Sequence, residues 1–212
     1  MEQLKLYLRE LRAWNLKINL TGLRTVEEMA VKHIGDTLTL LPVIPGQVCT
    51  VLDVGTGAGV PGLILKLLRP DLEIVLADAV RKKVSFLNAV IAFTGLRGIW
   101  AEHGRIGDAG IPGRVPIGGF DLVVSQAVTT VEGLVDIAGP MLSQKGIIIS
   151  MKGPGAEEEL KDKKELLQSR GWEIIVRMTR SAVRGYDRRL VLISRHEPVT
   201  RRQDIGNDRN AE

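Results

Sequence analysis

The stretch VLDVGTGAGVPG, residues 51–62, decides the fold of this chain. Its first four residues predict a strand that carries one acid, Asp53, and the next eight positions hold four glycines. Glycine at this density marks a place where the backbone turns sharply or lets another group come close. We therefore expect a strand that ends in a ligand-binding turn.

Strands and helices alternate from this turn onward, with turn residues between them. The pattern predicts strands at 51–54, 73–78, 98–101, 120–126, 146–152, 172–179 and 189–195, and helices at 58–68, 80–94, 132–142 and 156–170. Such alternation favours an open parallel sheet with helices on both faces. The short link between the last two strands makes them antiparallel neighbours. We therefore expect a Rossmann-like α/β fold with a mostly parallel, seven-stranded sheet.

The N-terminal segment is expected to be helical and to pack on the sheet domain. Apolar residues recur at helical spacing between residues 2 and 18. Thr25 and Glu28 have the spacing of a capping box, which starts a second helix that runs to about Leu41. We divide the chain into the helical segment 1–45, the sheet domain 46–196 and a polar tail, 197–212.

The bulk composition is that of an ordinary globular protein, with 44% hydrophobic and 25% charged residues among 212. No apolar run is long enough to span a membrane, and the charged N-terminus is not a signal peptide. Cys49 is the only cysteine, which excludes an intrachain disulfide. These features predict a cytoplasmic protein, which we expect to be a monomer.

Charge is distributed unevenly along the chain, although the formal net charge is only +4. One stretch, in which Asp187 is the only acid, contains Arg177, Arg180, Arg184, Arg188, Arg189 and Arg195. Such a stretch suits a polyanionic partner or, equally, a solvated surface. The segment 156–170 is expected to be one solvated helix with Glu–Lys pairs one turn apart, namely Glu157–Lys161 and Glu159–Lys163.

Two cofactor motifs overlap in the glycine turn. Gly57, Gly59 and Gly62 satisfy the G-x-G-x-x-G pattern of dinucleotide-binding domains. Asp53, Gly55, Gly57 and Gly59 also satisfy D-x-G-x-G-x-G, the first motif of S-adenosylmethionine-dependent methyltransferases. The motif alone leaves both cofactors open.

Asp78 closes the second predicted strand, about 20 residues after the glycines, where a carboxylate accepts ribose hydroxyls in both classes of enzyme. Two features favour the methyltransferase: the terminal strand pair, and a chain too short for the separate substrate domain of a hydride-transfer enzyme. We therefore predict S-adenosylmethionine, with its methionine moiety packed against Gly55 and its sulfonium near the carboxylate of Asp53.

Two long segments, WNLKINLTGLRTVEEMAVKHIGDTL (14–38) and VLDVGTGAGVPGLILKLLRPDLEIVLADAVRKKVSFL (51–87), resemble the bacterial small-subunit rRNA guanine-N7 methyltransferases, the RsmG or GidB family. The resemblance continues through FDLVVSQAV, GIIISMKG and GYDRRLVLI and covers roughly residues 10–195. Asn19, Thr21, His33 and Asp36 ahead of the glycine motif make it more specific than the glycines alone. It implies a class I methyltransferase fold and methylation of N7 of a guanine in 16S rRNA, near the decoding site.

Carried over by position, the resemblance implies cofactor contacts from Gly55, Val60, Ile106, Gly107 and Gln126. The chain departs from the family at two of these positions. The family has arginine at position 126, in a Ser-Arg-Ala context, where this chain has Ser-Gln-Ala. The family also has an acid where Gly107 stands. The glutamine removes a fixed charge beside the cofactor site, which predicts a slower enzyme.

The chemistry of guanine N7 fits the residues present. N7 carries an in-plane lone pair, so the reaction needs alignment of the reactants more than a general base. No certain catalytic residue is predicted; Gln126, Lys152 and Arg188 are candidates. Substrate-binding candidates are Asn19, His33, Lys152 and Arg188. Three of them have a plain structural alternative: Lys152 as a strand-end lysine, Arg188 as a solvated turn arginine, and His33 as a histidine satisfied within the fold.

Other methyl-transfer chemistries find less support. Methylation of an exocyclic amine commonly uses prolines after the fourth strand, where this chain has SQAV. Cytosine C5 methylation needs a cysteine nucleophile, and Cys49 precedes the first strand. A metal-dependent enzyme needs clustered carboxylates near the fourth strand, where Asp121 stands alone, so no metal site is expected. Two alternatives remain: an RNA- or ribosome-binding protein with weak or no turnover, and a methyltransferase for another substrate.

Overall fold

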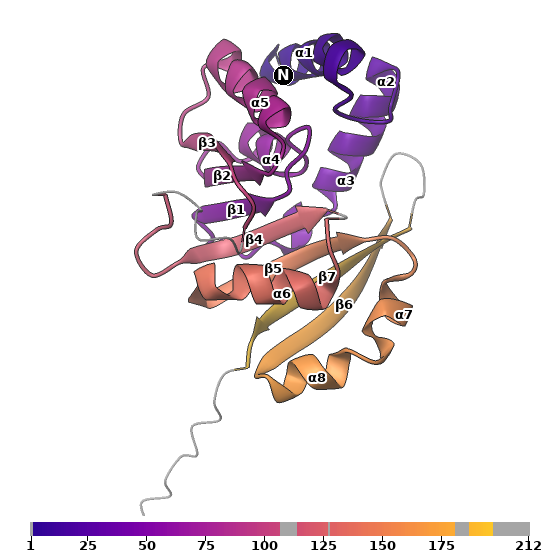
Figure 1. Cartoon of the computed structure of the whole chain (residues 1–212), viewed down its shortest axis with the longest axis vertical. Helices are drawn as coiled ribbons and strands as arrows, with labels where there is room; N and C mark the ends of the chain where they lie inside the picture. The colour runs from indigo at the N-terminus through magenta and orange to yellow at the C-terminus, as the bar shows by residue number, and fades with distance from the viewer. Residues whose placement is uncertain (1, 107–113, 127, 181–186, 197–212) are drawn as a thin grey trace, which may run out of the picture.

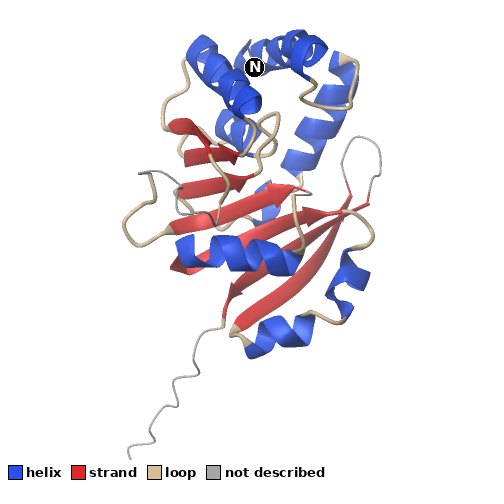
Figure 2. Ribbon diagram, in the orientation of Figure 1, coloured by secondary structure: helices blue, strands red, loops and turns tan. Residues whose placement is uncertain are grey.

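Seven strands form one sheet in the computed structural model of the chain, which describes residues 2–106, 114–126, 128–180 and 187–196 (Figures 1 and 2). The order across the sheet is β3-β2-β1-β4-β5-β7-β6. The strands are β1 Thr50–Val54, β2 Glu73–Asp78, β3 Ile99–His103, β4 Phe120–Gln126, β5 Leu142–Lys152, β6 Trp172–Arg180 and β7 Asp187–Arg195. All seven predicted strands are confirmed.

The expected antiparallel pair is β6 and β7, and β7 also runs antiparallel to β5. The other neighbouring strands pair in parallel, so β7 alone runs against the remaining six. From β1 the chain builds the sheet outward in one direction through β2 and β3, and β4 then starts the other half on the opposite side of β1. The carboxyl ends of β1 and β4 therefore lie side by side at a topological switch point, where open α/β sheets bind ligands.

Helices cover both faces of the sheet, as predicted (Figure 1). One face carries α1 Glu2–Ile18, α2 Val26–Met29, α3 Gly35–Leu38, α4 Gly62–Leu68 and α5 Arg81–Thr94. The other carries α6 Val131–Ala138, α7 Ala156–Lys161 and α8 Lys164–Ser169. Successive residues of a strand point to opposite faces, so Val51 belongs to the first core and Leu52 to the second. A strand buried on both faces reads as a continuous apolar run, which explains the character of β1.

The N-terminal segment joins the first of these cores. Tyr7, Leu8 and Leu11 of α1 are buried in the same cluster as residues of β1, α4 and α5. The capping box at Thr25 and Glu28 is present. The helix it starts is not continuous, because a π-helical turn, η1 Ala30–Ile34, separates α2 from α3. A 3₁₀ turn, η2 Leu41–Val43, follows.

Three predicted helices have different bounds. The helix predicted from residue 58 begins at Gly62, because residues 55–61 form the glycine turn and Pro61 is its N-cap. The helix predicted to end at 142 stops at Ala138, before the 3₁₀ turn η3 Gly139–Met141, which contains Pro140. The predicted helix 156–170 is two helices, α7 and α8, interrupted at Asp162 and Lys163.

The expected Glu–Lys pairs within that segment are wrong. Glu157 pairs with Arg189, and Glu159 pairs with Lys152 at 3.0 Å. Lys163 pairs with Glu132 of α6 at 2.9 Å, and Lys161 lies 3.9 Å from Glu158. The break at Asp162 and Lys163 separates Glu159 from Lys163, whereas Glu157 and Lys161 share α7 and Glu157 pairs with Arg189 instead. Nearby strands and helices supply partners that sequence spacing does not reveal.

Candidate active site

The glycine loop, residues 55–61, is held in place by the ends of β1 and β2. The backbone N–H groups of Gly55 and Thr56 donate to the carbonyl oxygen of Ala77, at 2.8 and 3.1 Å. The N–H of Gly57 donates to Asp78 Oδ2 at 2.9 Å, and the N–H of Val80 donates to Asp78 Oδ1 at 2.8 Å. The predicted cofactor residue Asp78 therefore orients the loop and the start of α5.

Asp53 lies beneath the loop and is fully buried. Its Oδ2 accepts hydrogen bonds from the Thr56 hydroxyl at 2.6 Å and from the N–H of Gly62 at 2.8 Å. Burial raises the pKa of Asp53 to about 7; the hydrogen bonds from Thr56 and Gly62 oppose this, and Asp78 adds to it. The contacts of Asp53 are thus within the protein, and its predicted role beside the sulfonium stays a prediction.

The four glycines of the loop have different surroundings. A Cβ at Gly55 would lie 2.3 Å from Val128, and one at Gly59 would lie 2.9 Å from Leu63. A Cβ at Gly62 would lie 2.7 Å from Asp53 Oδ2. Gly57 differs, because the nearest atom to a Cβ there is the carbonyl oxygen of Gly55, at 3.9 Å. The loop is packed on its inner side and open at Gly57.

Three further positions were predicted to contact the cofactor. Val60 is buried in the core of the α1 face, and Ile106, just after β3, is buried in the core of the opposite face. Both side chains serve packing, so cofactor contacts there would come from the backbone. Gly107 lies outside the described residues.

An open pocket of about 360 Å³ lies at the carboxyl ends of β4 and β5 and the start of β7. Four predicted site residues line it together: His33, Gln126, Lys152 and Arg188. The remaining lining residues are Lys32, Met151 and Gly153. The structure therefore brings residues from four distant parts of the chain to the same edge of the sheet as the glycine loop.

A buried carboxylate organises one side of this pocket. Asp36 of α3 is 1% exposed. Its oxygens accept two hydrogen bonds from Arg188, Nε to Oδ1 at 2.9 Å and Nη2 to Oδ2 at 2.8 Å. The side-chain amide of Gln126 donates to the same Oδ2 at 3.1 Å. Fork-to-fork pairing of this kind fixes the plane of the guanidinium as well as its position.

Lys152 takes part in a second network, on the opposite face of the sheet. Residues 151 and 152 alternate in direction along β5, so Met151 joins the core of the α1 face while Lys152 points toward α6 and α7. Lys152 Nζ donates to the carbonyl oxygen of Thr129 at 2.6 Å and pairs with Glu159 at 3.0 Å. Glu159 Oε1 also accepts from the N–H of Val131 at 2.5 Å. Lys152 thus joins three elements beside the pocket.

Of the two N-terminal candidates, His33 lines the pocket and Asn19 does not. The Nε2 atom of His33 is buried and has no hydrogen-bond partner among the described residues. Burial lowers the pKa of His33 to about 4; Asp36 opposes this shift and Lys32 adds to it. The imidazole beside the pocket is therefore neutral at pH 7. Asn19 is exposed, with a φ of +56° just after α1, and it is not among the residues that line the pocket.

The described arginines of the predicted basic stretch make different contacts. Arg188 and Arg195 lie at opposite ends of β7, and Arg195 stacks over the ring of Trp172 at 4.8 Å. Arg189 pairs with Glu157. The side chains of Arg180 and Arg184 lie outside the described residues. Arg188, Arg189 and Arg195 are therefore divided among separate contacts.

Sequence reasoning missed the parts played by Asp36 and Lys32. Asp36 carried part of the family resemblance, but no role was predicted for it. A signal existed, because His33 and Asp36 are three residues apart and so share a helix face. Lys32 is exposed, lines the pocket and forms no ion pair with another described residue. Nothing in the spacing distinguishes it from other surface lysines.

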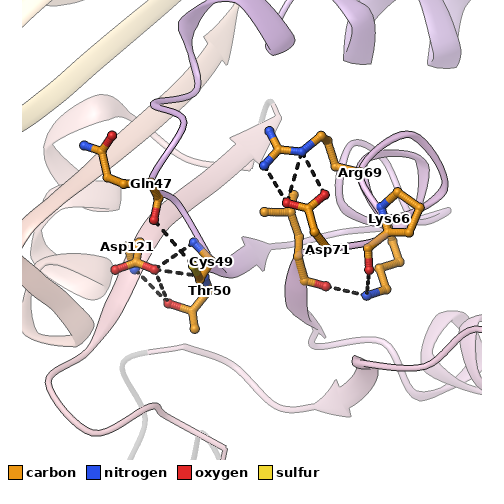
Figure 3. A network of polar contacts seen from close by, with 9 residues as sticks. Gln47, Cys49, Thr50, Lys66, Arg69, Asp71 and Asp121 are labelled. Carbon is orange, nitrogen blue, oxygen red and sulfur yellow. Dashed lines mark hydrogen bonds and ion pairs between the residues drawn. The ribbon is translucent and has the colours of Figure 1, made fainter.

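The opposite end of the sheet carries a different polar network (Figure 3). Asp121 Oδ2 accepts from the N–H groups of Cys49 and Thr50 at 3.0 and 2.9 Å, and from the Thr50 hydroxyl at 3.0 Å. Nearby, Lys66 Nζ donates to the carbonyl oxygens of Pro70 and Leu72. Asp121 and Cys49 therefore fasten the amino ends of β1 and β4, at the end of the sheet away from the pocket.

Among the described residues, no group of three His, Cys, Asp or Glu side chains is placed to hold a metal ion. No helix in this part of the chain is long and apolar enough to cross a membrane.

Residues 1–190 match the protein family described as rRNA small subunit methyltransferase G, or GidB. A relative with that name from Geobacter sp. strain M21 is 40% identical over 173 residues, which cover 81% of this chain and 77% of the relative. Another, from Streptococcus agalactiae serotype Ia, is 33% identical over 198 residues, covering 92% and 82%.

Solved structures of other methyltransferases have the same fold at low sequence identity. An O-methyltransferase from Bacillus cereus is 14% identical, with a TM-score of 0.60 over 89% of this chain and 90% of that one. A precorrin-6y C5,15-methyltransferase from Geobacter metallireducens is 15% identical, with a TM-score of 0.56 over 76% and 87%. The fold is therefore that of class I S-adenosylmethionine-dependent methyltransferases, as predicted.

Proposed function

Because the chain belongs to the rRNA small subunit methyltransferase G family, we propose that it transfers a methyl group from S-adenosylmethionine to N7 of a guanine in 16S rRNA, near the decoding site. The observation that carries this proposal is the pocket lined by His33, Gln126, Lys152 and Arg188, at the same sheet edge as the glycine loop. The proposed setting is the cytoplasm, with the small ribosomal subunit as partner and a monomeric enzyme.

Two features of the glycine loop suit S-adenosylmethionine: an open backbone position and a carboxylate beside it. The backbone at Gly57 is open to a ligand, since a Cβ there would meet only the carbonyl oxygen of Gly55 at 3.9 Å. Each carboxylate oxygen of Asp78 accepts one hydrogen bond within the protein, and Lys83 Nζ lies 3.8 Å from Oδ2, which leaves lone pairs for ribose hydroxyls. We assign the loop backbone at Gly55 and Gly57, together with Asp78, to cofactor binding. When bound, the cofactor supplies an electrophilic methyl group.

The pocket suits a neutral base that becomes cationic when it is methylated. Guanine presents O6 and N7 as acceptors on one edge, and Arg188 and Gln126 provide donors at the pocket wall. Asp36 holds both donors in place and contributes a negative charge close to the positive charge that develops on the base. His33, uncharged at pH 7, adds no opposing charge. Alignment and this electrostatic setting are the contribution we assign to the chain.

A methyl-transfer assay tests the proposal. The purified chain is incubated with S-adenosylmethionine labelled in the methyl group and with small subunits or 16S rRNA that lack the modification, and the product nucleoside is identified by mass spectrometry. We expect N7-methylguanine at one position. The Gly57→Val variant, which fills the open face of the loop and strains a φ of +60°, should bind no cofactor in calorimetry.

Other results separate the alternatives. Cofactor binding with RNA binding but no N7-methylguanine would favour an RNA-binding protein that has lost turnover. Transfer to a protein or small molecule in place of RNA would favour a different substrate class. Binding of NAD in place of S-adenosylmethionine would overturn the assignment of the glycine loop.

A further inference from the structure

Tyr7, on the N-terminal helix α1, makes the one long-range polar contact that the described part of α1 offers to the glycine loop. Its side chain is fully buried. Its hydroxyl donates to the carbonyl oxygen of Ala58 at 3.0 Å, across 51 residues of sequence. Burial, with the nearby Asp53 carboxylate as a smaller cause, raises the pKa of Tyr7, so the hydroxyl keeps its proton and donates.

The hydroxyl has no role in the packing of the ring. The ring lies against Phe86, with centroids 6.5 Å apart, and a phenylalanine would fill the same space. A hydroxyl buried without a partner costs free energy, so its presence is favourable only because Ala58 accepts its hydrogen bond. The contact with Ala58 therefore explains why this core position carries tyrosine.

The peptide between Ala58 and Gly59 is held at both ends. Its carbonyl accepts from Tyr7, and its N–H donates to the carbonyl oxygen of Thr56 at 2.8 Å. A peptide unit is planar, so two opposed hydrogen bonds fix its orientation. Among the described residues, Tyr7 supplies the only hydrogen bond to the Ala58 carbonyl. The adjoining residue, Gly57, is the open position of the loop.

We infer that Tyr7 is a positioning residue for the cofactor loop: its hydroxyl fixes the Ala58–Gly59 peptide and so preorganises the backbone at Gly57 for S-adenosylmethionine. The inference rests on the proposed function, because it takes the loop to be the cofactor site. β1 and β2 hold the loop through Asp53, Ala77 and Asp78, and α1 adds a third support from a distant part of the chain.

The test compares Tyr7→Phe with the wild type in two measurements. Calorimetry should give a dissociation constant for S-adenosylmethionine that is raised about three- to tenfold, the effect of one lost hydrogen bond. The single-turnover rate at saturating cofactor should stay near that of the wild type, because the variant loses preorganisation and not a contact with the reacting atoms. Hydrogen exchange in the free protein should become faster at the amides of Gly59 and Val60.

Two variants of α1 serve as controls. Gln3→Ala removes the other long-range hydrogen bond of this helix, from Gln3 Nε2 to the Thr94 carbonyl oxygen, which is remote from the loop. Leu11→Ala loosens the packing of α1, where Leu11 is fully buried, and keeps the Tyr7 hydroxyl. Both should leave the dissociation constant and the exchange at Gly59 near the wild-type values.

The outcomes separate this inference from the proposed function. A wild-type chain that binds no S-adenosylmethionine overturns the proposed function, and the exchange experiment still reports whether Tyr7 fixes the loop. An unchanged dissociation constant and unchanged exchange in Tyr7→Phe overturn the inference. Equal weakening by Leu11→Ala would also overturn it, because the effect would then come from helix docking.

Discussion

The role of Gln126 depends on Arg188, because both side chains bind the same carboxylate, that of Asp36. The amide of Gln126 and the guanidinium of Arg188 both donate to the buried carboxylate of Asp36. The family has arginine at position 126, so the glutamine of this chain led us to expect a site that lacks a cation. In this chain Arg188 already supplies a cation at the pocket wall, held by two hydrogen bonds.

We expect that Gln126→Arg does not raise turnover. A second guanidinium would compete with Arg188 for one carboxylate, and like charges a few Å apart repel by on the order of 1–4 kcal/mol. The methylated base also gains a positive charge, which a further cation disfavours. Single-turnover methylation of unmodified small subunits should give a rate equal to the wild type or up to about tenfold lower.

A neutral control separates charge from the lost hydrogen bond. Gln126→Leu removes the donor to Asp36 without adding a charge, and its rate should lie between those of the wild type and the arginine variant. An arginine variant at least fivefold faster than the wild type would show that the site lacks a cation, contrary to this account.

His33 should make the folded chain sensitive to acid. Burial holds the pKa of His33 at about 4 in the folded chain, below its ordinary value of 6.5. The unfolded state therefore binds the extra proton first, and the stabilisation present above pH 6.5 is lost as the pH falls toward 4. The upper limit is about 3 kcal/mol.

The measurement is the difference in the free energy of unfolding between the wild type and His33→Gln, followed from pH 7 to pH 4. The difference should move in favour of the variant as the pH falls. Asp53, whose raised pKa acts in the opposite direction, is the same in both proteins and cancels. His103→Gln, at an exposed position, is the control. A difference that does not vary with pH would contradict the prediction.

At the scale of elements, Lys152 and Glu159 join the end of β5 to the start of α6 and to α7. Lys152 contacts Thr129, just before α6, and Glu159 of α7 accepts from Val131, the first residue of α6. Val128, in the same short link, is the residue that would meet a side chain at Gly55. The two charged residues therefore fasten the segment that packs over the glycine loop.

We expect Lys152→Met to lower the stability of the fold more than it changes RNA binding. The charge of Lys152 is balanced by Glu159, 3.0 Å away, so its loss should change the log–log salt slope of RNA binding by much less than one unit. Lys32→Met is the matched variant, since Lys32 is exposed and lines the same pocket. Its slope should fall by roughly one unit if Lys32 contacts a phosphate.

Thermal unfolding and salt-dependent binding of 16S rRNA check both variants. The melting temperature should fall in Lys152→Met and stay near the wild type in Lys32→Met. A full unit of slope lost in Lys152→Met, with unchanged stability, would restore the simpler interpretation that Lys152 contacts a phosphate.

At the scale of the whole molecule, α1 is part of the first core and should unfold with it. Leu11 is fully buried among residues of the same cluster as β1, α4 and α5. We expect Leu11→Ala to lower the free energy of unfolding by about 2–5 kcal/mol. Leu16→Ala, on the same helix but 84% exposed, should change it by less than about 0.5 kcal/mol.

Urea titration, followed by circular dichroism and by tryptophan fluorescence, measures the free energy of unfolding of both variants. The two signals should change together in each variant, because Trp14 reports on the first core and Trp172 on the second. A separate early transition of the N-terminal helices would show that α1 is an appendage and not part of one cooperative unit.

Most of the fold could be predicted from the sequence, because its signals are local. Apolar runs of strand length, the glycine turn after Asp53 and the alternation of strands and helices are read within a few residues. The failures occurred where local signals compete with distant ones. The segment 156–170 reads as one helix with internal ion pairs, yet Lys152, Arg189 and Glu132 take its charged residues as partners.

The sequence by itself determined the glycine loop, the strand that carries it and the family to which the chain is similar, because these depend on residues close together in the chain. Only the tertiary structure decided on which face of the sheet each polar side chain lies and which partner it contacts there. Gln126 and Arg188 meet at Asp36, while Lys152 faces Glu159. That division follows from the two-residue period of strands and from the pairing of β4, β5 and β7. The contact of α3 with the start of β7 adds the longest link, between Asp36 and Arg188, 152 positions apart.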